Sequence, residues 1–395
     1  MNNLPVLRLN SKADYRLNHG HLWVYSNEID NSAQKLTALN AGELAIIANA
    51  AGKNLGVAYV NPNTLICARI LSFDLHTPIN VDFFIDKITA ALTLRTMIFT
   101  PECYRLIYGE SDFLPGLVVD RFFDVLVVQI STAGMEKLLD YILPALEQVI
   151  KPRAILLKND GKMRSVEGLD SYVRWYSGSN VGFIPLIENG VKFFAPVLEG
   201  QKTGWFYDHR LMRQRLQVYA PQQRVLDVFS YIGGWGIQAA ACGAKQVICN
   251  DVSELALEYV VRNAQQNNLT NVTTIQGDAF SVMEKLIDQQ ERFSLVILDP
   301  PAFIPRRKDV AKGKAAYQKA NLLAMRLLVP GGILISGSCS MHLTTTDLLE
   351  VMYKSALKLK RQMQILEEGQ QGPDHPVHPA IAETKYLKSF IARII

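Results

Sequence analysis

In the second half of the chain, short runs rich in apolar and β-branched residues alternate with longer segments of mixed polarity. Four of these runs are Val225–Phe229, Gln246–Asp251, Val272–Gln276 and Phe293–Leu298, and a fifth is Gly332–Ser336. Runs of this length, separated by helix-length segments, are typical of strands in a parallel sheet that is covered on both faces. The pattern therefore predicts a doubly wound, Rossmann-like α/β domain over residues 186–395.

The first 75 residues have a different pattern, in which short apolar runs are broken by glycine and proline. This pattern predicts small β strands. Leu44–Asn49 and Leu55–Val60 are expected to form a hairpin, and Trp23 is expected to belong to the core. The segment is therefore predicted to be a small β domain.

Residues 76–185 are predicted to form a central α+β domain. A helix is expected over Val81–Phe99, and a second over Met135–Ile150. The predicted strands of this region are Leu117–Asp120, Val125–Ile130 and Ala154–Lys158. The intervening Gly109–Gly116 segment is rich in turn formers, which favours a hairpin connection over a binding site.

Composition indicates a chain with ordinary globular domains. With 395 residues, 49% hydrophobic and 20% charged, it is long enough for two or three cores. No apolar stretch reaches the length of a membrane span, and the N-terminus lacks a signal-peptide pattern. The five cysteines show no C-x-x-C spacing, so a reduced, cytoplasmic chain without structural disulfides or zinc is predicted. A net charge of +4 permits nucleic-acid binding without requiring it.

The first strand of the α/β domain leads into a serine and three glycines, Ser230 to Gly236, after which a helix is predicted. Glycines in such a turn let backbone N–H groups approach a ligand closely, although the spacing is not that of dinucleotide-binding enzymes. Acids follow three later strands: Asp251 is positioned to accept from a ribose hydroxyl, Asp278 to meet an adenine edge, and Asp299 ends the fourth strand. The order predicts a pocket for a nucleoside-bearing cofactor, with ordinary turn chemistry as the alternative.

The order of these motifs resembles that of class I S-adenosylmethionine-dependent methyltransferases. Asp227–Gly236 is similar to their first motif, and Asp299-Pro300-Pro301 to the motif at their reaction centre. Farther upstream, Gln201-Lys202-Thr203-Gly204 is similar to a segment of one RNA-modifying subgroup. Together with Arg16, His19, Trp23 and Val24 near the start and the motifs Gly109–Asp112 and Leu114–Gly116, almost the whole chain resembles the bacterial 23S ribosomal RNA cytosine-C5 methyltransferases that carry an N-terminal PUA domain.

The resemblance implies a PUA domain over residues 1–75, a central α+β domain over 76–185 and a methyltransferase domain over 186–395. It implies S-adenosyl-L-methionine as cofactor and 23S ribosomal RNA as partner; a homodimer is compatible with the sequence. The cofactor-binding residues that it implies are Thr203, Phe206, Asp227, Phe229, Ser230, Gly233, Gly234, Asp251, Asp278 and Asp299. The residues expected to bind RNA are Lys12, Arg16, Phe303, Arg306 and Arg307.

Methylation at C5 of cytosine requires a covalent nucleophile, because C5 alone attacks a methyl sulfonium poorly. A thiolate that adds to C6 makes C5 enamine-like and able to attack. Cys339 follows the Gly332–Ser336 strand in a small polar turn and is the predicted nucleophile. Asp299 is predicted to hold the N3/N4 edge of the cytosine. The group that removes the C5 proton is not assigned.

One position departs from another RNA cytosine-C5 family, which has a second cysteine directly after its Pro-Pro motif. Here that position is Ala302, which implies a mechanism with one cysteine. The following Phe303 is expected either to stack on an extruded base or to pack beneath its loop. A basic segment with Arg306 and Arg307 comes next and is expected to contact phosphate, with a solvated surface loop as the alternative.

Two further readings of the chain are open. An RNA adenine-N6 methyltransferase would also use an Asp-Pro-Pro motif, but it would have no use for Cys339. A non-catalytic RNA-binding assembly protein could keep the cofactor fold as a scaffold, although the intact strand-end acids argue against this. His375 and His378 could suggest a metal, but a proline-stiffened loop is favoured because no acid or cysteine cluster accompanies them.

Overall fold

The computed structural model describes residues 4–32, 34–178 and 183–395. The described chain separates into two compact units. The first unit comprises residues up to 184 together with 196–205 and 373–384, and the second comprises 185–195, 206–372 and 385–395. The predicted methyltransferase segment 186–395 therefore contributes two short stretches to the first unit.

The first sheet of the first unit is a small five-stranded β structure, as the sequence predicts. Its strands lie in the order β1-β3-β4-β5-β2, with β1 parallel to β3 and the other pairs antiparallel. The bounds are β1 Val6–Arg8, β2 Trp23–Tyr25, β3 Leu44–Ala48, β4 Asn54–Val60 and β5 Ile66–Ser72, with the short helix α1 at Tyr15–Asn18. The predicted hairpin is confirmed as β3 and β4. Trp23, predicted to be core, packs at the core's edge and stays partly exposed.

The second sheet of this unit has the order β10-β9-β8-β7-β6. Its strands are β6 Cys103–Tyr108, β7 Leu117–Phe122, β8 Val125–Ile130, β9 Ala154–Asn159 and β10 Tyr172–Ser177. Its helices are α2 Val81–Ile98, α3 Ala133–Lys137, α4 Leu139–Ile150 and α5 Met163–Val166. The single helix predicted over Met135–Ile150 is wrong in one respect: it begins two residues earlier and is interrupted at Leu138, where φ is −94° and ψ is 6°.

The two sheets of the first unit share buried contacts. Tyr59 of β4 and Leu71 of β5 are part of the hydrophobic cluster that fills the core between the central sheet and its helices. The Tyr59 ring lies so close to Gly134 that a side chain there would overlap it, and its hydroxyl donates to the Pro115 carbonyl oxygen at 2.8 Å. The Gly109–Gly116 segment connects the antiparallel strands β6 and β7, so the hairpin prediction is confirmed.

The second unit is built around a seven-stranded sheet with the order β15-β14-β13-β16-β17-β19-β18. The strands β13 to β17 run parallel, whereas β19 is antiparallel to both β17 and β18. The bounds are β13 Arg224–Val228, β14 Gln246–Asp251, β15 Val272–Gln276, β16 Phe293–Leu298, β17 Leu328–Ser338, β18 Met363–Gln370 and β19 Lys388–Ile394. A two-stranded hairpin, β11 Ile184–Glu188 and β12 Val191–Ala195, precedes these strands in the sequence.

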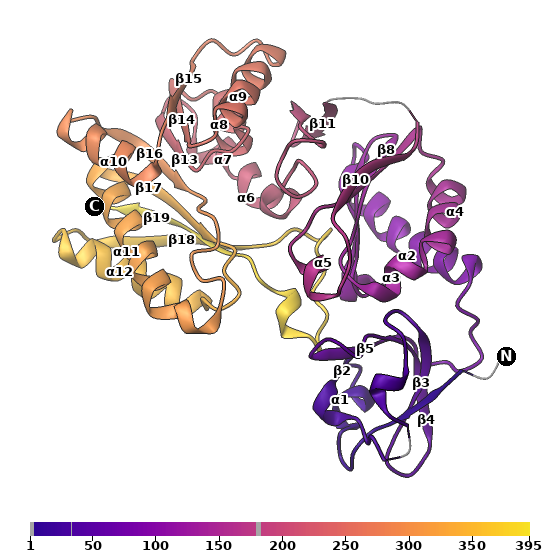
Figure 1. Cartoon of the computed structure of the whole chain (residues 1–395). Coiled ribbons are helices and arrows are strands. Elements are labelled where there is room, and N and C mark those ends of the chain that lie inside the picture. Colours follow the sequence, from indigo (N-terminus) through magenta and orange to yellow (C-terminus); the bar gives the residue numbers. More distant parts are fainter. Residues whose placement is uncertain (1–3, 33, 179–182) are drawn as a thin grey trace. The chain divides into compact units, whose positions relative to one another are not determined.

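Helices cover both faces of this sheet, which confirms the α/β fold predicted from the sequence. The apolar side chains of α10, α11 and α12 form one core cluster with residues of β13, β16 and β17. Figure 1 shows these three helices next to one another. The helix α8 packs against the opposite face, since a Cβ at Gly236 would meet Cys249 and Val247. The helices are α6 Arg210–Gln214, α7 Leu216–Tyr219, α8 Gly234–Ala241, α9 Glu254–Gln266, α10 Ala279–Asp288, α11 Val310–Leu327 and α12 Thr345–Lys358.

Candidate active site

The carboxyl ends of β13, β14, β16 and β17 meet at one edge of the sheet, where the strand order reverses between β13 and β16. Ligands of open α/β sheets bind at this topological switch point. Asp251 lies at the carboxyl end of β14, Asp299 at that of β16 and Cys339 at that of β17. The structure therefore brings the predicted cofactor acids and the predicted nucleophile to one end of one sheet.

The turn after β13 has an unusual backbone conformation. Gly233 has a φ of 84°, and two non-glycine residues, Phe229 and Tyr231, also have positive φ values of 65° and 48°. Each such residue costs roughly 1–2 kcal/mol, so the turn persists only because its surroundings fix it. The Asp251 carboxylate is one of these surroundings, because its Oδ2 atom accepts a hydrogen bond from the Tyr231 N–H at 2.8 Å.

Asp227 lies beneath this turn and is fully buried. Its Oδ2 atom accepts from the Gly236 N–H at 2.8 Å, which ties the first turn of α8 to β13. Burial raises the pKa of the Asp227 carboxyl well above its usual range, and the hydrogen bond from Gly236 only partly opposes this. The neighbouring Ser230 is also buried, and its hydroxyl has no partner among the described residues.

The other predicted cofactor residues lie around the same strand ends, with one exception. Asp278 caps α10 by accepting from Ser281 N at 3.0 Å and is exposed. Phe206 packs edge-on against the Tyr231 ring, with 5.5 Å between the centroids. Thr203 belongs to the first unit, where its buried hydroxyl donates to Asp120 Oδ2 at 2.5 Å.

Asp299 is held from two sides. His209 Nε2 lies 3.0 Å from Asp299 Oδ1, and Trp235 Nε1 donates to Asp299 Oδ2 at 3.0 Å. Burial alone would raise the pKa of the Asp299 carboxyl, but the His209 imidazole and the Trp235 N–H hold it below its usual value. Burial likewise opposes the charged form of His209, yet the Asp299 carboxylate raises the pKa of this imidazole. The carboxylate is thus kept ionised, oriented and about one-quarter exposed.

Cys339 stands between two serines whose side chains turn inward. The Tyr317 hydroxyl lies 2.8 Å from both Ser338 Oγ and Ser340 Oγ, and both serines are fully buried. Ser340 Oγ also accepts from Ile304 N at 3.2 Å, which links this loop to the one that follows Asp299. Cys339 itself remains partly exposed, so it is the residue of the three that the loop presents to a ligand.

A buried lysine braces the same loop from β19. Lys388 Nζ donates to the carbonyl oxygens of Ser340 and Leu343, both at 2.6 Å. Burial lowers the pKa of Lys388 to about 8. Sequence reasoning assigned no role to Lys388, His209 or Tyr317. The signal that could have found Lys388 is a lysine at the start of the mostly apolar terminal strand Lys388–Ile394.

Phe303 packs within the fold. Its ring centroid lies 4.8 Å from that of Tyr317 and 6.1 Å from those of Phe229 and Phe280. It is partly buried against the core cluster of this face. These contacts agree with the expectation that Phe303 packs beneath its loop. They also hold the Phe229 ring in place.

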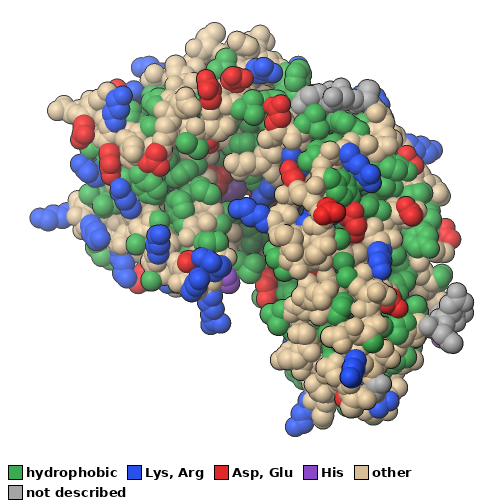
Figure 2. Space-filling model, in the orientation of Figure 1, with side chains coloured by type: hydrophobic (Ala, Val, Ile, Leu, Met, Phe, Trp, Pro, Cys, Tyr) green, Lys and Arg blue, Asp and Glu red, His purple; other side chains and the backbone are tan. Residues whose placement is uncertain are grey.

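The predicted RNA-binding side chains differ in their surroundings. Arg306 and Arg307 are exposed, and Arg306 pairs with Asp309 at 2.9 Å. Lys12 is exposed, whereas both oxygens of Glu28 accept from Arg16 Nη2 at 2.7 and 2.8 Å. On the face visible in Figure 2, basic side chains are interspersed with acidic ones.

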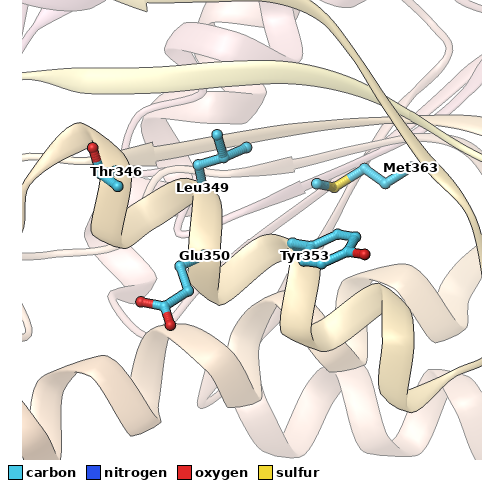
Figure 3. A pocket seen from close by; sticks show the side chains of 5 residues that line it. All are labelled: Thr346, Leu349, Glu350, Tyr353 and Met363. Carbon is cyan, nitrogen blue, oxygen red and sulfur yellow. The ribbon is translucent and has the colours of Figure 1, made fainter.

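A separate cavity of about 300 Å³ in the second unit contains none of the predicted site residues. It lies between α12 and β18, with the Met363 thioether beside the Tyr353 ring (Figure 3). Its remaining lining residues are Thr346, Leu349 and Glu350, and the last pairs with Lys354 at 2.6 Å. Such a lining offers packing but no groups for methyl transfer.

The described residues were also compared with the requirements of a metal site and of a membrane span. No group of three or more His, Cys, Asp and Glu residues is arranged to hold a metal ion in the described ranges. Within the same ranges, no helix combines the length and the apolarity that a membrane span needs.

Comparison with known proteins extends these observations. The chain is 35% identical over 382 residues to Ribosomal RNA large subunit methyltransferase I of Erwinia tasmaniensis, covering 95% of this chain and 96% of that protein. It is 34% identical over 388 residues to the protein of the same name from Aliivibrio fischeri, with 97% of each covered. A putative S-adenosylmethionine-dependent methyltransferase from Streptococcus mutans has the same fold, with a TM-score of 0.82 at 21% identity, covering 99% of this chain and 100% of that one.

Two family models match parts of this chain. Residues 7–73 match the PUA-like domain family, which confirms the fold expected for the first strands. Residues 106–389 match the S-adenosylmethionine-dependent methyltransferase family, which confirms the predicted cofactor. The glycine turn, the strand-end acids and the unpaired buried Ser230 hydroxyl fit a nucleoside-bearing ligand at this edge. The chain belongs to the S-adenosylmethionine-dependent methyltransferases and carries a PUA-like domain at its N-terminal end.

Proposed function

We propose that this protein methylates C5 of a cytosine in large-subunit (23S) ribosomal RNA through a covalent bond between Cys339 and C6 of the base. The RNA substrate is proposed from the names of its relatives, which are ribosomal RNA large subunit methyltransferases. The observation that carries the chemistry is that the partly exposed Cys339 directly follows β17, the parallel neighbour of the strand β16 that Asp299 follows.

The cofactor supplies an electrophilic methyl group, and the residues of this chain would hold it by its nucleoside. Asp251 is proposed to accept from the ribose hydroxyls, and Asp278 to meet the adenine edge. The backbone of the turn from Ser230 to Gly234 is proposed to approach the amino-acid part. This assignment is supported by the left-handed conformation of Gly233, since a residue with a Cβ would be strained there.

The Cys339 thiolate is proposed to add to C6, so that the electron pair of the C5–C6 bond becomes available at C5 for methyl transfer. Asp299, kept ionised by His209 and Trp235, is proposed to accept from the N4 amine of the cytosine and to hold the base edge. Loss of the C5 proton then restores the double bond and expels the thiolate. No side chain is assigned to that last proton transfer.

Gly337, two residues before Cys339, supports the proposal that Asp299 and Cys339 act on the same base. A Cβ at Gly337 would lie 3.3 Å from His209 Cε1 and 3.7 Å from Asp299 Oδ1. The backbone two residues before Cys339 therefore passes directly beside the carboxylate. This closeness is what a base held by Asp299 and attacked by Cys339 requires.

The basic side chains Lys12, Arg306 and Arg307 are proposed to contact RNA phosphates, because they are exposed. Arg16 is proposed as a weaker contact, since Glu28 already engages its guanidinium.

RNA that carries 5-fluorocytidine tests the covalent step. Fluorine at C5 cannot leave as a proton, so methylation of such a base stops at the cysteine adduct. We expect the wild-type protein with S-adenosylmethionine to form a complex with fluorinated 23S RNA that survives denaturing electrophoresis. Cys339→Ala should form none, while Cys242→Ala, which removes another partly exposed thiol, should behave like the wild type. An adduct formed by Cys339→Ala would contradict the assignment.

A further inference from the structure

The first unit contains a second cavity, of about 300 Å³, which has no part in the methyl-transfer site. It lies where β2 and β5 of the PUA-like sheet face the β6–β7 connection and the short helix Ala382–Thr384. Its volume falls at the lower end of the roughly 300–1,000 Å³ range of small-molecule pockets. It could therefore hold a group of the size of a single nucleobase.

One wall of this cavity is a buried arginine with unused donors. Arg69 is buried, with a relative exposure of 7%. Its Nη1 atom lies 3.0 Å from Glu167 Oε1 and 3.4 Å from the Ile66 carbonyl oxygen. Its Nε and Nη2 atoms make no hydrogen bond within the described part of the chain. A ligand that brings acceptors into the cavity would give these two nitrogens hydrogen-bond partners.

The cavity also has carboxylates with free acceptor capacity. Glu110 Oε1 accepts from Trp23 Nε1 at 3.0 Å, and its second oxygen has no partner among the described residues. Glu383 makes no ion pair or hydrogen bond in the same ranges. Glu167, in contrast, is fully used by Arg69, by Asn61 at 2.7 Å and by the Ala133 N–H at 3.2 Å.

The balance of charge selects what can enter. Three carboxylates and one guanidinium line the cavity, so its net charge is negative and a phosphate group is repelled. A neutral base with both donors and acceptors is favoured instead. Two aromatic side chains line the cavity: Trp23 is partly exposed and donates to Glu110, and the Tyr108 hydroxyl donates to the Thr384 carbonyl oxygen at 3.1 Å. Aromatic side chains of this kind stack on unpaired RNA bases.

We propose that this cavity binds one unpaired guanine of the RNA substrate, which rests on the proposed function in that the substrate is RNA. Guanine offers O6 and N7 as acceptors for Arg69, and its N1–H and N2 amine are donors for Glu110 and Glu383. Adenine has no O6 acceptor, and its amine would face the arginine. Uracil and cytosine each offer fewer groups to this set of partners.

Binding of short RNA to the full-length protein tests this directly, by fluorescence anisotropy and without methyl transfer. The probes are oligouridylates with one central guanosine, adenosine or inosine. We expect the guanosine probe to bind about tenfold more tightly than the adenosine probe, with inosine between them because it lacks the N2 amine. Glu383→Ala should remove the difference between guanosine and inosine. Arg69→Lys, which retains a charge for Glu167, should remove the difference between guanosine and adenosine.

Glu147→Ala is the matched control, because Glu147 is an exposed acid on α4 of the same unit and lines no part of this cavity. Equal affinity of the wild type for all three probes would overturn the proposal, as would a guanosine preference that survives in both variants. Free guanosine monophosphate should bind more weakly than the guanosine probe, because its terminal phosphate carries about two negative charges whereas each phosphodiester of the probe carries one; tighter binding would overturn the assignment to RNA. A product other than 5-methylcytidine would refute the proposed function while leaving these affinities unchanged.

Discussion

At the scale of single residues, the reaction centre depends on neighbours that fix the two reacting side chains. Asp299 is oriented by His209 and Trp235, and Cys339 is presented because the serines on both sides are turned inward. A carboxylate held by two donors loses little freedom when a substrate binds. The supporting residues are therefore as much a part of the site as the two that are proposed to touch the base.

Replacement of Asp251 by alanine tests the proposed cofactor pocket. We expect Asp251→Ala to weaken S-adenosylmethionine binding by about 10- to 100-fold in calorimetry, because a charged acceptor for the ribose is lost. Asp251→Asn, which keeps one acceptor oxygen for the Tyr231 N–H, should lose less. Asp288→Ala, at an exposed acid of α10, is the control. Unchanged affinity in Asp251→Ala would remove this residue from the ribose role.

The sequence predicted the residues of the site that sit in motifs, but not those that act through the fold. Asp251 and Asp299 could be located because the first is the last residue of one predicted strand and the second directly follows another. His209 lies 90 positions before Asp299, and Lys388 lies 48 positions after Ser340, so no local pattern connects them. Such long-range pairings depend on strand order, which a single sequence does not encode as a spacing.

At the scale of elements, Lys388 couples β19 to the loop that carries Cys339. Its ammonium group donates to two carbonyl oxygens of that loop, and burial lowers its pKa to about 8. The charged form that braces the loop is therefore present below pH 8 and is lost as the pH rises through 8. The proposed thiolate, in contrast, is favoured by rising pH. Methyl transfer should decline on the alkaline side for this reason.

Lys388→Arg tests this brace through its pH profile. Arginine keeps its charge above pH 8, so the alkaline decline of the methylation rate should disappear or move to higher pH. Lys388→Met should lower the rate across the whole profile while cofactor binding is retained. Lys385→Arg, at an exposed lysine just before the same strand, should keep the wild-type profile. An alkaline decline at the same pH in Lys388→Arg would show that another group causes it.

Several strands with a compact apolar or β-branched sequence were predicted with the correct bounds, whereas two strands at sheet edges were missed. The strands β14, β15 and β16 begin and end at the predicted residues, because each is a compact apolar or β-branched run. The strand β18 was not predicted, since Met363–Gln370 lies at the sheet edge and is mostly polar in its second half. The strand β10 was also missed; it too lies at a sheet edge, and every residue of Tyr172–Ser177 is only partly buried or exposed.

At the scale of the whole molecule, the PUA-like sheet and the central sheet belong to one compact unit. A change in strand pattern along the sequence marks a boundary between the two sheets but does not show which surfaces pack together. Tyr59 of the first sheet is fully buried within the core of the second. Removal of residues 1–75 would therefore expose apolar surface and leave Glu167 without Arg69 and Asn61.

Tyr59→Phe measures this coupling without removing the domain. The ring is kept against Gly134, but the hydroxyl that meets Pro115 O and Thr132 Oγ1 is lost. A buried carbonyl without its donor costs about 1–2 kcal/mol, which should lower the thermal midpoint of the first unit by about 2–6 °C. Tyr176→Phe, at an exposed tyrosine of β10, should leave the midpoint unchanged. Equal midpoints for Tyr59→Phe and the wild type would mean that this contact contributes nothing to stability.

Identification of the methylated nucleoside is the direct test of the proposed methylation at C5 of cytosine. Unmodified 23S ribosomal RNA would be incubated with the protein and isotopically labelled S-adenosylmethionine, then digested to nucleosides and analysed by mass spectrometry. We expect labelled 5-methylcytidine with the wild-type protein and none with Cys339→Ala. Labelled methyladenosine, or 5-methylcytidine formed at the wild-type rate by Cys339→Ala, would contradict this expectation.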